Sequence, residues 1–512
     1  MRKICLWLPL LALLLNSCFE DDGNYTYTDV DEIIIEGIED YYVKNSYNGE
    51  VLQITPTIKT NYTDLEYEWW LWDPREEETS GWDPTKEPYE AELIGTEKDL
   101  NYEVNCPLGE YTLMLKVISK SNGYFNTYVT KFDSQTLFTR GFYILKESSD
   151  GNTELDLYNR DNTLMTDLLT LTQGAPLEGR PRCLSTVIGH GNQVDNEFVR
   201  LHSVCVTTEA NKVSFYETES FEKVHDENDV IMTPMDPAVD KPYMAFSYGF
   251  GNFFISSRGM NASFCTSMGM DITGQFPIPS TSQGGSIHVL NDNSTGIPMV
   301  YHWSDTEHCI QYADSYSYGQ DFFGPFNNND FVTEDKDCLM CGACAPEGKG
   351  YFLLVDQTGK QYIYVISTGS AMITDSVEID ADSKLAHATE YAVNAMTTNW
   401  LYFVYDNKVY VYDLTSFTEH DTPLNLGGIS ADEEITYLSY QYQDFNNDTE
   451  NNFTHLIVGT QQGDTYRLYM YNMIAGEPNE LVRTIVGTGK MKMCAYMSSV
   501  DYDGSGIMSI PN

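Results

Sequence analysis

Residues 350–368 read GYFLLVDQTGKQYIYVIST, and this stretch predicts a β-hairpin. Two runs rich in β-branched and aromatic residues, FLLV and YIYVI, flank the polar sequence DQTGK, which supplies the residue types that tight turns favour. The same arrangement returns at residues 402–412, where YFVY and KVYVY flank the pair DN. Both stretches are therefore expected to form two antiparallel strands joined by a short turn.

Strand-rich modules of this kind recur from Phe138 to the end of the chain, at a spacing of roughly 40 to 55 residues. Their starting points can be marked near Gly141, Cys183, Tyr243, Gly285, Gly350, Glu390 and Glu434. A period of this length is typical of propeller blades rather than of solenoid coils. We expect residues 137–512 to form a β-propeller of about seven blades. A large irregular β-sandwich, or two separate β domains, is the alternative.

The region before the repeats, residues 31–136, contains short alternating runs separated by turns. In its clearest strand, residues 109–118, Tyr111, Leu113, Leu115 and Val117 alternate with other side chains. A strand with one apolar and one wet face is typical of a sandwich. Further strands are expected at residues 32–38, 51–59, 65–72, 89–95 and 102–104. The chain is therefore predicted to be all-β, a β-sandwich followed by a propeller.

The N-terminus has the pattern of an export signal. Two basic residues after Met1 precede an apolar run that ends at Leu15 and is too short to span a bilayer. The pair NS then leads to Cys18 and the acidic sequence FEDD. This pattern resembles bacterial lipoprotein signals, in which cleavage exposes the cysteine for acylation. We expect residues 1–17 to be a signal peptide, Cys18 to carry lipid and residues 18–30 to form an acidic tether. An ordinary signal peptide with an incidental cysteine is the alternative.

Two strands of the sandwich carry a more specific resemblance. LEYEWWLW at residues 65–72 and LGEYTLMLKV at residues 108–117 are similar to the Trp-centred strand and the G-x-Y-x-L-x-L-x-V strand of PKD-type, immunoglobulin-like (Ig-like) sandwiches. With the N-terminal signal, the whole chain resembles the PKD-like family of Bacteroidetes surface lipoproteins, although it has no clear W-x-F-G-D-G turn. The resemblance implies an N-terminal Ig/PKD-like domain and a lipid anchor in the outer membrane, exposed on the cell surface.

The same resemblance implies a function in nutrient binding. Members of the family look like accessories of TonB-dependent outer-membrane transporters, which would be the protein partner. The end face of the propeller would then offer a shallow bowl in which Tyr and Trp side chains stack on a small molecule, glycan or peptide.

The charge of the chain excludes one class of partner. There are 29 Lys and Arg against 76 Asp and Glu, a net charge of −47. Such a surface repels nucleic acid and anionic membrane, so no nucleic-acid partner is expected and the membrane is reached through the lipid. The hydrophobic fraction of 42% and the aromatic fraction of 13% argue against disorder in spite of this charge.

Among the 11 cysteines, Cys338, Cys341 and Cys344 form the sharpest local pattern. The C-x2-C-x2-C spacing lets three thiolates converge on a soft metal such as Cu(I) or Zn(II), and it matches the start of a bacterial ferredoxin run, but Gly348 stands in place of the fourth ligand. The three cysteines lie in residues 314–349, the longest stretch without strand alternation, which we expect to be a loop at the propeller rim. A disulfide or free thiols are favoured over a bound metal, and no other cofactor is expected.

Three weaker patterns have ordinary structural explanations. His302, Asp305 and His308, with Cys309 adjacent, have zinc-ligand chemistry, but their spacing matches no known signature and a polar turn is favoured. MKMCAYM at residues 491–497 has soft-metal chemistry, yet its alternation is that of an inner propeller strand with a buried face. Residues 501–506, DYDGSG, resemble half of a calcium loop and are expected to be a turn.

Sequence motifs for catalysis are lacking. The chain has no G-x-S-x-G elbow, no H-E-x-x-H and no Gly-rich phosphate loop. We therefore favour a non-enzymatic, ligand-binding accessory for uptake. A surface adhesin or soft-metal-binding module is the alternative, and a propeller enzyme that cleaves glycans with a carboxylate pair is a third class.

Overall fold

The computed structural model describes residues 31–46, 50–74, 91–194, 197–248, 251–264, 274–276, 284–292, 299–314, 324–325, 331–344, 348–367, 372–394, 397–443 and 453–497. The chain divides into two compact units, Met1–Ser134 and Gln135–Asn512. The expected signal peptide, Cys18, the tether and the turn at residues 501–506 lie outside the described residues. Within these ranges, no helix is long and apolar enough to cross a membrane.

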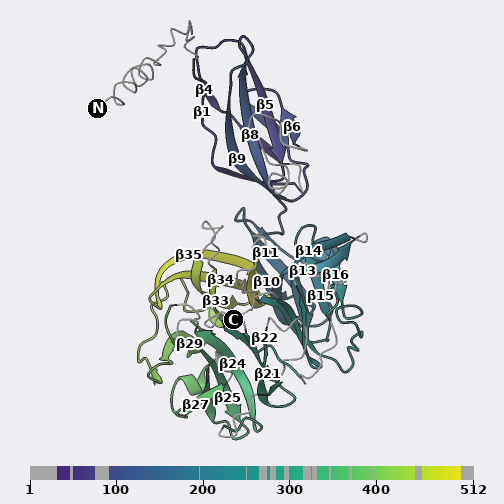
Figure 1. Cartoon of the computed structure of the whole chain (residues 1–512). Coiled ribbons are helices and arrows are strands. Elements are labelled where there is room, and N and C mark those ends of the chain that lie inside the picture. Colours follow the sequence, from purple (N-terminus) through teal and green to yellow (C-terminus); the bar gives the residue numbers. More distant parts are fainter. Residues whose placement is uncertain are drawn as a thin grey trace, which may run out of the picture. The chain divides into compact units, whose positions relative to one another are not determined.

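The N-terminal unit is a β-sandwich (Figure 1). One layer is a five-stranded sheet in the order β2-β9-β8-β5-β6, and two strand pairs, β1-β4 and β3-β7, pack against it. The strands are β1 (Ile34–Glu36), β2 (Tyr41–Asn45), β3 (Val51–Ile54), β4 (Thr57–Lys59), β5 (Leu65–Trp72), β6 (Glu92–Gly95), β7 (Leu100–Glu103), β8 (Gly109–Ser119) and β9 (Phe125–Gln135). In the core, Trp69 of β5 is paired with Leu115 of β8, and both are fully buried against Leu52 and Leu100 from the other layer.

The strands of the sandwich agree with the sequence in part. The apolar face expected for residues 109–118 is confirmed, because Leu113, Leu115 and Val117 are fully buried. The strand expected at residues 51–59 is divided into β3 and β4 around Pro56, which has no N–H to donate to a ladder. Strands β2 and β9 were not predicted, since polar residues such as Asn45 and Thr130 occupy buried positions in them.

The C-terminal unit contains, in its described residues, seven small sheets of three or four strands. The first holds β10 (Gly141–Glu147), β11 (Thr153–Asn159), β12 (Leu164–Met165) and β36 (Lys490–Met497). The second holds β13 (Pro181–Val194), β14 (Glu197–Thr208), β15 (Val213–Glu217) and β16 (Lys223–Asp226), and the third β17 (Pro242–Tyr248), β18 (Gly251–Ser256) and β19 (Gly259–Phe264).

The remaining four sheets follow in chain order. The fourth holds β20 (Val289–Asp292), β21 (Met299–Ser304), β22 (Cys309–Asp314) and β23 (Gly324–Pro325), and the fifth β24 (Lys336–Cys344), β25 (Lys349–Asp356), β26 (Gln361–Ser367) and β27 (Met372–Glu378). The sixth holds β28 (Tyr391–Val393), β29 (Trp400–Tyr405), β30 (Lys408–Asp413) and β31 (Thr418–Glu419), and the seventh β32 (Glu434–Gln443), β33 (Phe453–Gln462), β34 (Thr465–Ile474) and β35 (Glu477–Thr488). Short helices are α3 (Leu168–Gln173) and η3 (Leu385–His387).

Seven hydrophobic clusters join these sheets into a closed ring. Each cluster takes buried side chains from at least two consecutive sheets, and the last one joins the seventh sheet to the first. In β10, for example, Phe142 and Ile144 face the seventh sheet, whereas Tyr143 and Leu145 face the second. Because both faces of the sheets are buried, their strands are nearly continuous apolar runs. This ring of sheets is a seven-bladed β-propeller, as expected from the repeats.

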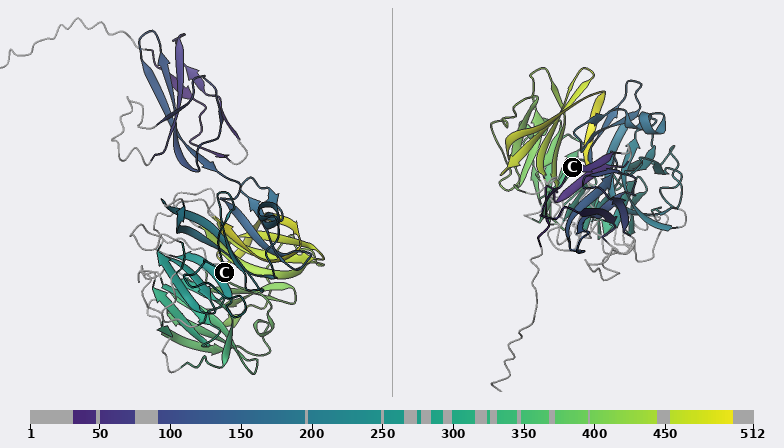
Figure 2. Two further views of the ribbon diagram at one scale, coloured as in Figure 1. Left: turned by 90° about the vertical axis from the view of Figure 1, so that its right-hand side faces the viewer. Right: turned by 90° about the horizontal axis from the view of Figure 1, so that it is seen from above.

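The C-terminal strand closes the ring. Strand β36 is antiparallel to β10, with Met497 opposite Gly141 and Lys490 opposite Glu147. The yellow C-terminal strand accordingly lies beside the blue strands of the first sheet (Figure 2). The inner strand expected from the alternation of MKMCAYM is confirmed, and Met491, Cys494 and Met497 are buried in it.

The hairpins that introduced the repeats are also confirmed. Asp356 accepts hydrogen bonds from the backbone N–H groups of Thr358 and Lys360, at 2.8 and 3.0 Å, and thereby holds the turn between β25 and β26. Asp406 and Asn407 join β29 to β30 with φ of 49° and 57°, the two positive values that a type I′ hairpin turn requires.

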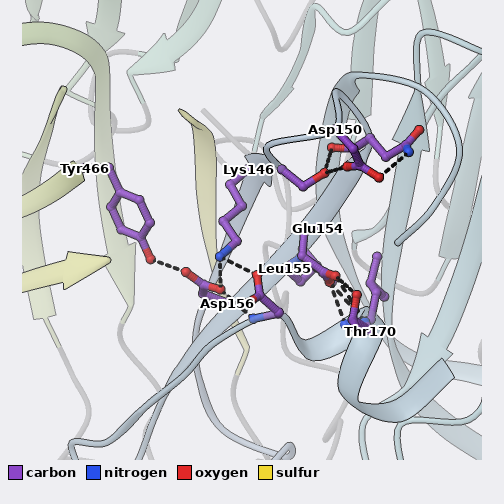
Figure 3. Close-up of polar contacts among 11 residues, drawn as sticks. Lys146, Asp150, Glu154, Leu155, Asp156, Thr170 and Tyr466 are labelled. Atoms are coloured by element: carbon purple, nitrogen blue, oxygen red, sulfur yellow. Dashed lines mark hydrogen bonds and ion pairs between the residues drawn. The ribbon is translucent and has the colours of Figure 1, made fainter. Parts of the chain in front are cut away.

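A buried ion-pair network lies at the closure of the ring (Figure 3). The Nζ of Lys146 in β10 lies 2.7 Å from Oδ1 of Asp156 in β11 and 2.8 Å from Oδ1 of Asp167. Tyr466 of β34 donates its hydroxyl hydrogen bond to Asp156 at 2.6 Å. Burial opposes the charge on Lys146, but the two carboxylates outweigh burial and raise the pKa of this lysine. The contact between Tyr466 and Asp156, both fully buried, therefore joins the first sheet to the seventh, while Asp167 is exposed.

The same close-up shows how α3 begins. The carboxylate of Glu154 accepts hydrogen bonds from the backbone N–H of Leu169 at 2.7 Å and from the hydroxyl of Thr170 at 2.5 Å (Figure 3). A carboxylate in this place satisfies N–H groups that the first turn of a helix leaves without partners.

The expected loop at residues 314–349 is wrong for its second half. Strand β24 covers Lys336–Cys344 and is an edge strand of the fifth sheet, so this sheet begins well before the expected Gly350. A register shift between Cys338 and Met340 breaks the alternation of the strand, and Gly342 and Ala343 add no large apolar side chain. These two features hide the strand from a search for periodicity.

Candidate ligand-binding site

A cavity of about 550 Å³ lies where one edge strand from each of the seven sheets meets the others. We call these strands the inner strands: β13, β17, β20, β24, β28, β32 and β36. Each contributes to the wall, through Cys183, Met244, Val289, Met340, Val393, Leu438 and Met493 respectively. The cavity is therefore the central channel of the propeller.

The wall of the channel combines apolar and polar surface in similar amounts and is rich in sulfur. Five of its residues, Cys183, Met244, Met340, Cys341 and Met493, carry a thiol or thioether. Burial raises the pKa of the Cys183 thiol to about 12 and raises that of Cys341 as well, so both are neutral near pH 7. The Sδ of Met493 accepts a hydrogen bond from the N–H of Leu184 at 3.2 Å. This part of the wall presents a polarisable surface without charge.

Four residues with basic or acidic side chains also line the cavity, and all lie at or just before the beginnings of inner strands. They are Arg182, His288, Glu390 and Lys492.

Two of these side chains have protein partners. The guanidinium of Arg182 donates to the carbonyl of Pro242 at 2.7 Å and to Oδ1 of Asn211 at 2.8 Å, and it lies 5.8 Å from the ring centre of Tyr243. Burial lowers the pKa of His288 to about 4, although a hydrogen bond to the backbone of Cys338 opposes this shift. Arg182 is therefore held by the protein, and His288 is neutral near pH 7.

Glu390 and Lys492 differ from them. In the part of the chain that the structure describes, neither the carboxyl of Glu390 nor the Nζ of Lys492 makes a hydrogen bond or an ion pair. The backbone carbonyl of Glu390 accepts from the N–H of Val404 at 3.0 Å, which fixes the main chain beside the cavity. Burial raises the pKa of Glu390 to about 7, and the attraction of Lys492 opposes this shift. The cavity thus offers one carboxyl and one ammonium group that are available to a ligand.

The aromatic bowl expected at the propeller end stays a prediction, and the central cavity has a different lining. The described lining includes Tyr391 and Tyr437, whose hydroxyl donates to the carbonyl of Cys494 at 3.2 Å, while its other apolar residues are aliphatic or contain sulfur.

The structure brings two of the three predicted metal ligands to the same face of β24. Cys338 and Cys341 both pack against the cluster between the fourth and fifth sheets, whereas Met340 faces the sixth sheet. The bulge beside Leu339 allows this, since residues three apart in a regular strand face opposite sides. The side chain of Cys344 lies outside the described residues, so a site formed by all three cysteines stays a prediction.

The two histidines of the weaker zinc-like pattern have different surroundings. His302 lies in β21 and is fully buried, and burial lowers its pKa to about 4. Nδ1 of His308 lies 2.7 Å from the carbonyl of Lys336, in the neighbouring sheet. Among the described residues, no group of three or more His, Cys, Asp or Glu side chains could hold a metal ion.

Sequence reasoning did not find Arg182, His288, Glu390 and Lys492. A usable signal for Arg182, His288 and Glu390 was their place near the beginnings of predicted modules, because the first strand of these modules borders the channel, whereas Lys492 lies in the last strand, β36. Glu390 was marked as such a starting point, but nothing in one sequence shows which side chains at these points turn inward.

Comparison with known proteins supports the N-terminal assignment. Residues 18–181 match the PKD-like family. The match begins at Cys18 and extends through the sandwich and the strands β10, β11 and β12 of the first propeller sheet. No curated protein sequence matches the chain.

Several solved structures are distantly similar. A quinonprotein alcohol dehydrogenase-like protein from Bacteroides thetaiotaomicron is 14% identical, with a TM-score of 0.38 and coverage of 92% of this chain and 100% of that one. The periplasmic gluconolactonase PpgL of Pseudomonas aeruginosa is 10% identical, with a TM-score of 0.40 and coverage of 70% and 99%. PorZ of Porphyromonas gingivalis, a surface component of the type-IX secretion system, is 10% identical, with a TM-score of 0.34 and coverage of 68% and 39%. At such distances the propeller assignment rests on the closed ring of sheets.

Proposed function

Residues 18–181 belong to the PKD-like family, and from this premise we propose that the protein is a cell-surface lipoprotein that binds a small ligand for a TonB-dependent outer-membrane transporter. The observation that carries the proposal is the central cavity of about 550 Å³, whose wall combines apolar and sulfur-containing side chains with two charged groups that have no partner among the described residues. Ligand sites are typically cavities that combine apolar surface with a few polar groups that orient the ligand.

The proposed location rests on the N-terminus. The lipoprotein-like signal in residues 1–17 and the acidic sequence after Cys18 support a lipid anchor that faces the outside of the outer membrane. The match to the PKD-like family begins at the same cysteine. A net charge of −47 keeps the protein away from anionic surfaces, so its contact with the membrane would depend on the lipid.

The test is purification of the full chain from its own outer membranes in a mild detergent, followed by mass spectrometry of the proteins that accompany it. A barrel transporter in near-equal amount supports the uptake function. A variant with Cys18→Ser, which cannot be acylated at this position, is the matched control and is expected to leave the membrane fraction. Reproducible recovery of the anchored protein without a transporter would contradict the proposal.

A surface enzyme acting on glycans is the second candidate, and Glu390 is the observation that favours it. A carboxyl group whose pKa lies at about 7 suits a general acid. Most glycoside hydrolases use a second carboxyl group across the site, however, and in the described lining of the cavity Glu390 is the one carboxyl. Loss of sugar release from a panel of soluble polysaccharides in Glu390→Gln, with the fold intact, would favour the enzyme.

A soft-metal module is the third candidate, supported by Cys338 and Cys341 on one face of β24. Burial raises the pKa of both thiols, which opposes the thiolate form that binds metals. Elemental analysis of protein purified under reducing conditions decides this point, and a metal-free protein would remove the candidate.

A further inference from the structure

The two charged groups of the cavity come from two different sheets of the propeller. Glu390 immediately precedes β28 in the sixth sheet, and Lys492 lies near the start of β36 in the first. Only the inner strand β32 of the seventh sheet stands between β28 and β36 in the ring, and its Tyr437 and Leu438 line the same cavity. The two groups sense each other electrostatically, yet they do not form an ion pair with each other.

The charges that a ligand must satisfy follow from this arrangement. A neutral ligand would remove water from the carboxylate and the ammonium without replacing the lost hydrogen bonds, which is costly for charged groups. A purely anionic ligand would satisfy Lys492 and be repelled by Glu390, and a purely cationic ligand would do the reverse. A ligand with both charges satisfies both residues at once.

Resting on the proposed function, we propose that the cavity binds a zwitterionic ligand with an apolar body, namely a free amino acid or a short peptide. The ligand's ammonium group lies at Glu390 and its carboxylate at Lys492. Its apolar side chains contact the neutral wall formed by residues such as Met244, Met340 and Met493. Arg182 is held by Pro242 and Asn211 and serves to shape the wall.

The pH dependence of binding follows from the groups that face Glu390. Lys492 from β36 and Arg182 from β13 are charged, and His288, before β20, is neutral above about pH 5 because burial lowers its pKa to about 4. Burial raises the pKa of Tyr391 to about 12 and that of Cys183 to about 12, so these groups stay neutral too. Glu390 is thus the described lining group that titrates near neutrality, and affinity for an ammonium ligand rises as the pH increases through about 7.

Isothermal titration calorimetry on the full chain in mild detergent tests the inference. The probes are leucyl-leucine, phenylalanyl-leucine and methionyl-methionine, each compared with its N-acetylated and its C-amidated form. We expect at least one free dipeptide to bind, and either modification to weaken its binding about ten-fold or more, as loss of a charge-assisted contact does. No binding by any of the three free dipeptides at millimolar concentration overturns the inference, as does equal binding of free and modified forms.

Variants assign the two ends of the ligand. Glu390→Gln is expected to weaken binding of the free dipeptide about ten-fold and to leave the N-acetylated form unchanged. Lys492→Gln is expected to do the same for the carboxylate end, leaving the C-amidated form unchanged. Lys490→Gln in the same strand and Glu334→Gln before β24 are the matched controls, because both residues are exposed and neither lines the cavity. Equal losses for free and modified dipeptides in the cavity variants would contradict the assignment.

This experiment and the copurification fail independently. A transporter that copurifies with a protein unable to bind the dipeptides leaves the uptake function in place and refutes the zwitterionic ligand. Binding of dipeptides by a protein that copurifies with no transporter keeps the ligand class and refutes the uptake partner.

Discussion

Two lysines of the first propeller sheet have opposite surroundings. Lys146 in β10 is 2% exposed and touches two carboxylates at 2.7 and 2.8 Å. Lys492 lies in β36, the strand paired with β10, yet its side chain is exposed to the channel and has no ion pair in the described structure. Lys146 belongs to the polar network at the contact between the first and seventh sheets, whereas Lys492 lines the cavity.

The difference separates structural charges from charges that are free to bind. A buried charge that has complete partners contributes to a unique packing. Removing one partner leaves the other charge buried and unpaired, which strongly destabilises the fold. A charge that lines a cavity without a partner contributes little to folding but remains available to a ligand. In a chain with 76 acidic residues, carboxylates are plentiful, so the open position of Lys492 is the informative one.

The largest expected effect is on stability, from Lys146→Gln. This change leaves Asp156, which is fully buried, without its cation, and we expect the propeller to lose about 3 to 5 kcal/mol of unfolding free energy. Denaturant unfolding followed by tryptophan fluorescence measures it. Lys360→Gln removes an exposed ion pair with Glu378 and is the control, with little or no loss of stability expected. Equal losses in the two variants would show that burial does not distinguish these lysines.

A smaller loss is expected from Tyr466→Phe, which sharpens the comparison by keeping both charges. The variant removes only the 2.6 Å hydrogen bond from the seventh sheet to Asp156. Hydrogen bonds to charged groups contribute about 1.5 to 3 kcal/mol, so the expected destabilisation lies in that range. Tyr405→Phe is a suitable control, because this half-buried tyrosine lies in β29, away from the network. A loss no larger than that of the control would mean that the ring closure does not depend on this contact.

Much of the fold was predictable from local patterns. The repeat of hairpins at propeller spacing gave the blade count, because each sheet buries both faces and therefore has conspicuous apolar strands. Strand β36 was also recognisable as an inner strand, through the alternation of MKMCAYM. Strand β24 was not, since a bulge at Leu339 and the small residues Gly342 and Ala343 remove the periodic signal.

The site was much less predictable than the fold. The C-x2-C-x2-C pattern attracted attention because its spacing is a known motif, whereas Glu390 and Lys492 are ordinary residue types about 100 positions apart. What makes them a candidate pair is the closure of the ring, which brings the sixth and first sheets to one channel. Such a juxtaposition depends on long-range packing, and no local feature of one sequence reports it.

Glu390→Gln is expected to change the unfolding free energy by less than Lys146→Gln or Tyr466→Phe, and to stabilise the protein rather than destabilise it. Burial raises the folded-state pKa of Glu390 to about 7, above the value of roughly 4.3 expected in the unfolded chain. The charged carboxylate therefore destabilises the fold fully above pH 7, and this penalty disappears as the pH falls toward 4. We expect the variant to be about 1 to 2 kcal/mol more stable than the natural protein near pH 8, less than the full shift implies because the side chain keeps some exposure. Unfolding curves near pH 8 and pH 4 measure the difference. A variant that gains the same stability at both pH values would show that the gain does not come from removing the charge of this carboxylate.

The smallest effect on stability is expected from Lys492→Gln, and it completes the comparison with Lys146→Gln. Since Lys492 is exposed and has no described ion pair, its replacement is expected to change the unfolding free energy by less than about 0.5 kcal/mol. The identical substitution at two positions of one sheet thus separates a structural lysine from one available for binding. The same denaturant series measures both, with Lys490→Gln in β36 as the control for a substitution in that strand. A loss at Lys492 that approached the loss at Lys146 would mean that Lys492 supports the fold, and its open position in the channel would then say nothing about a ligand.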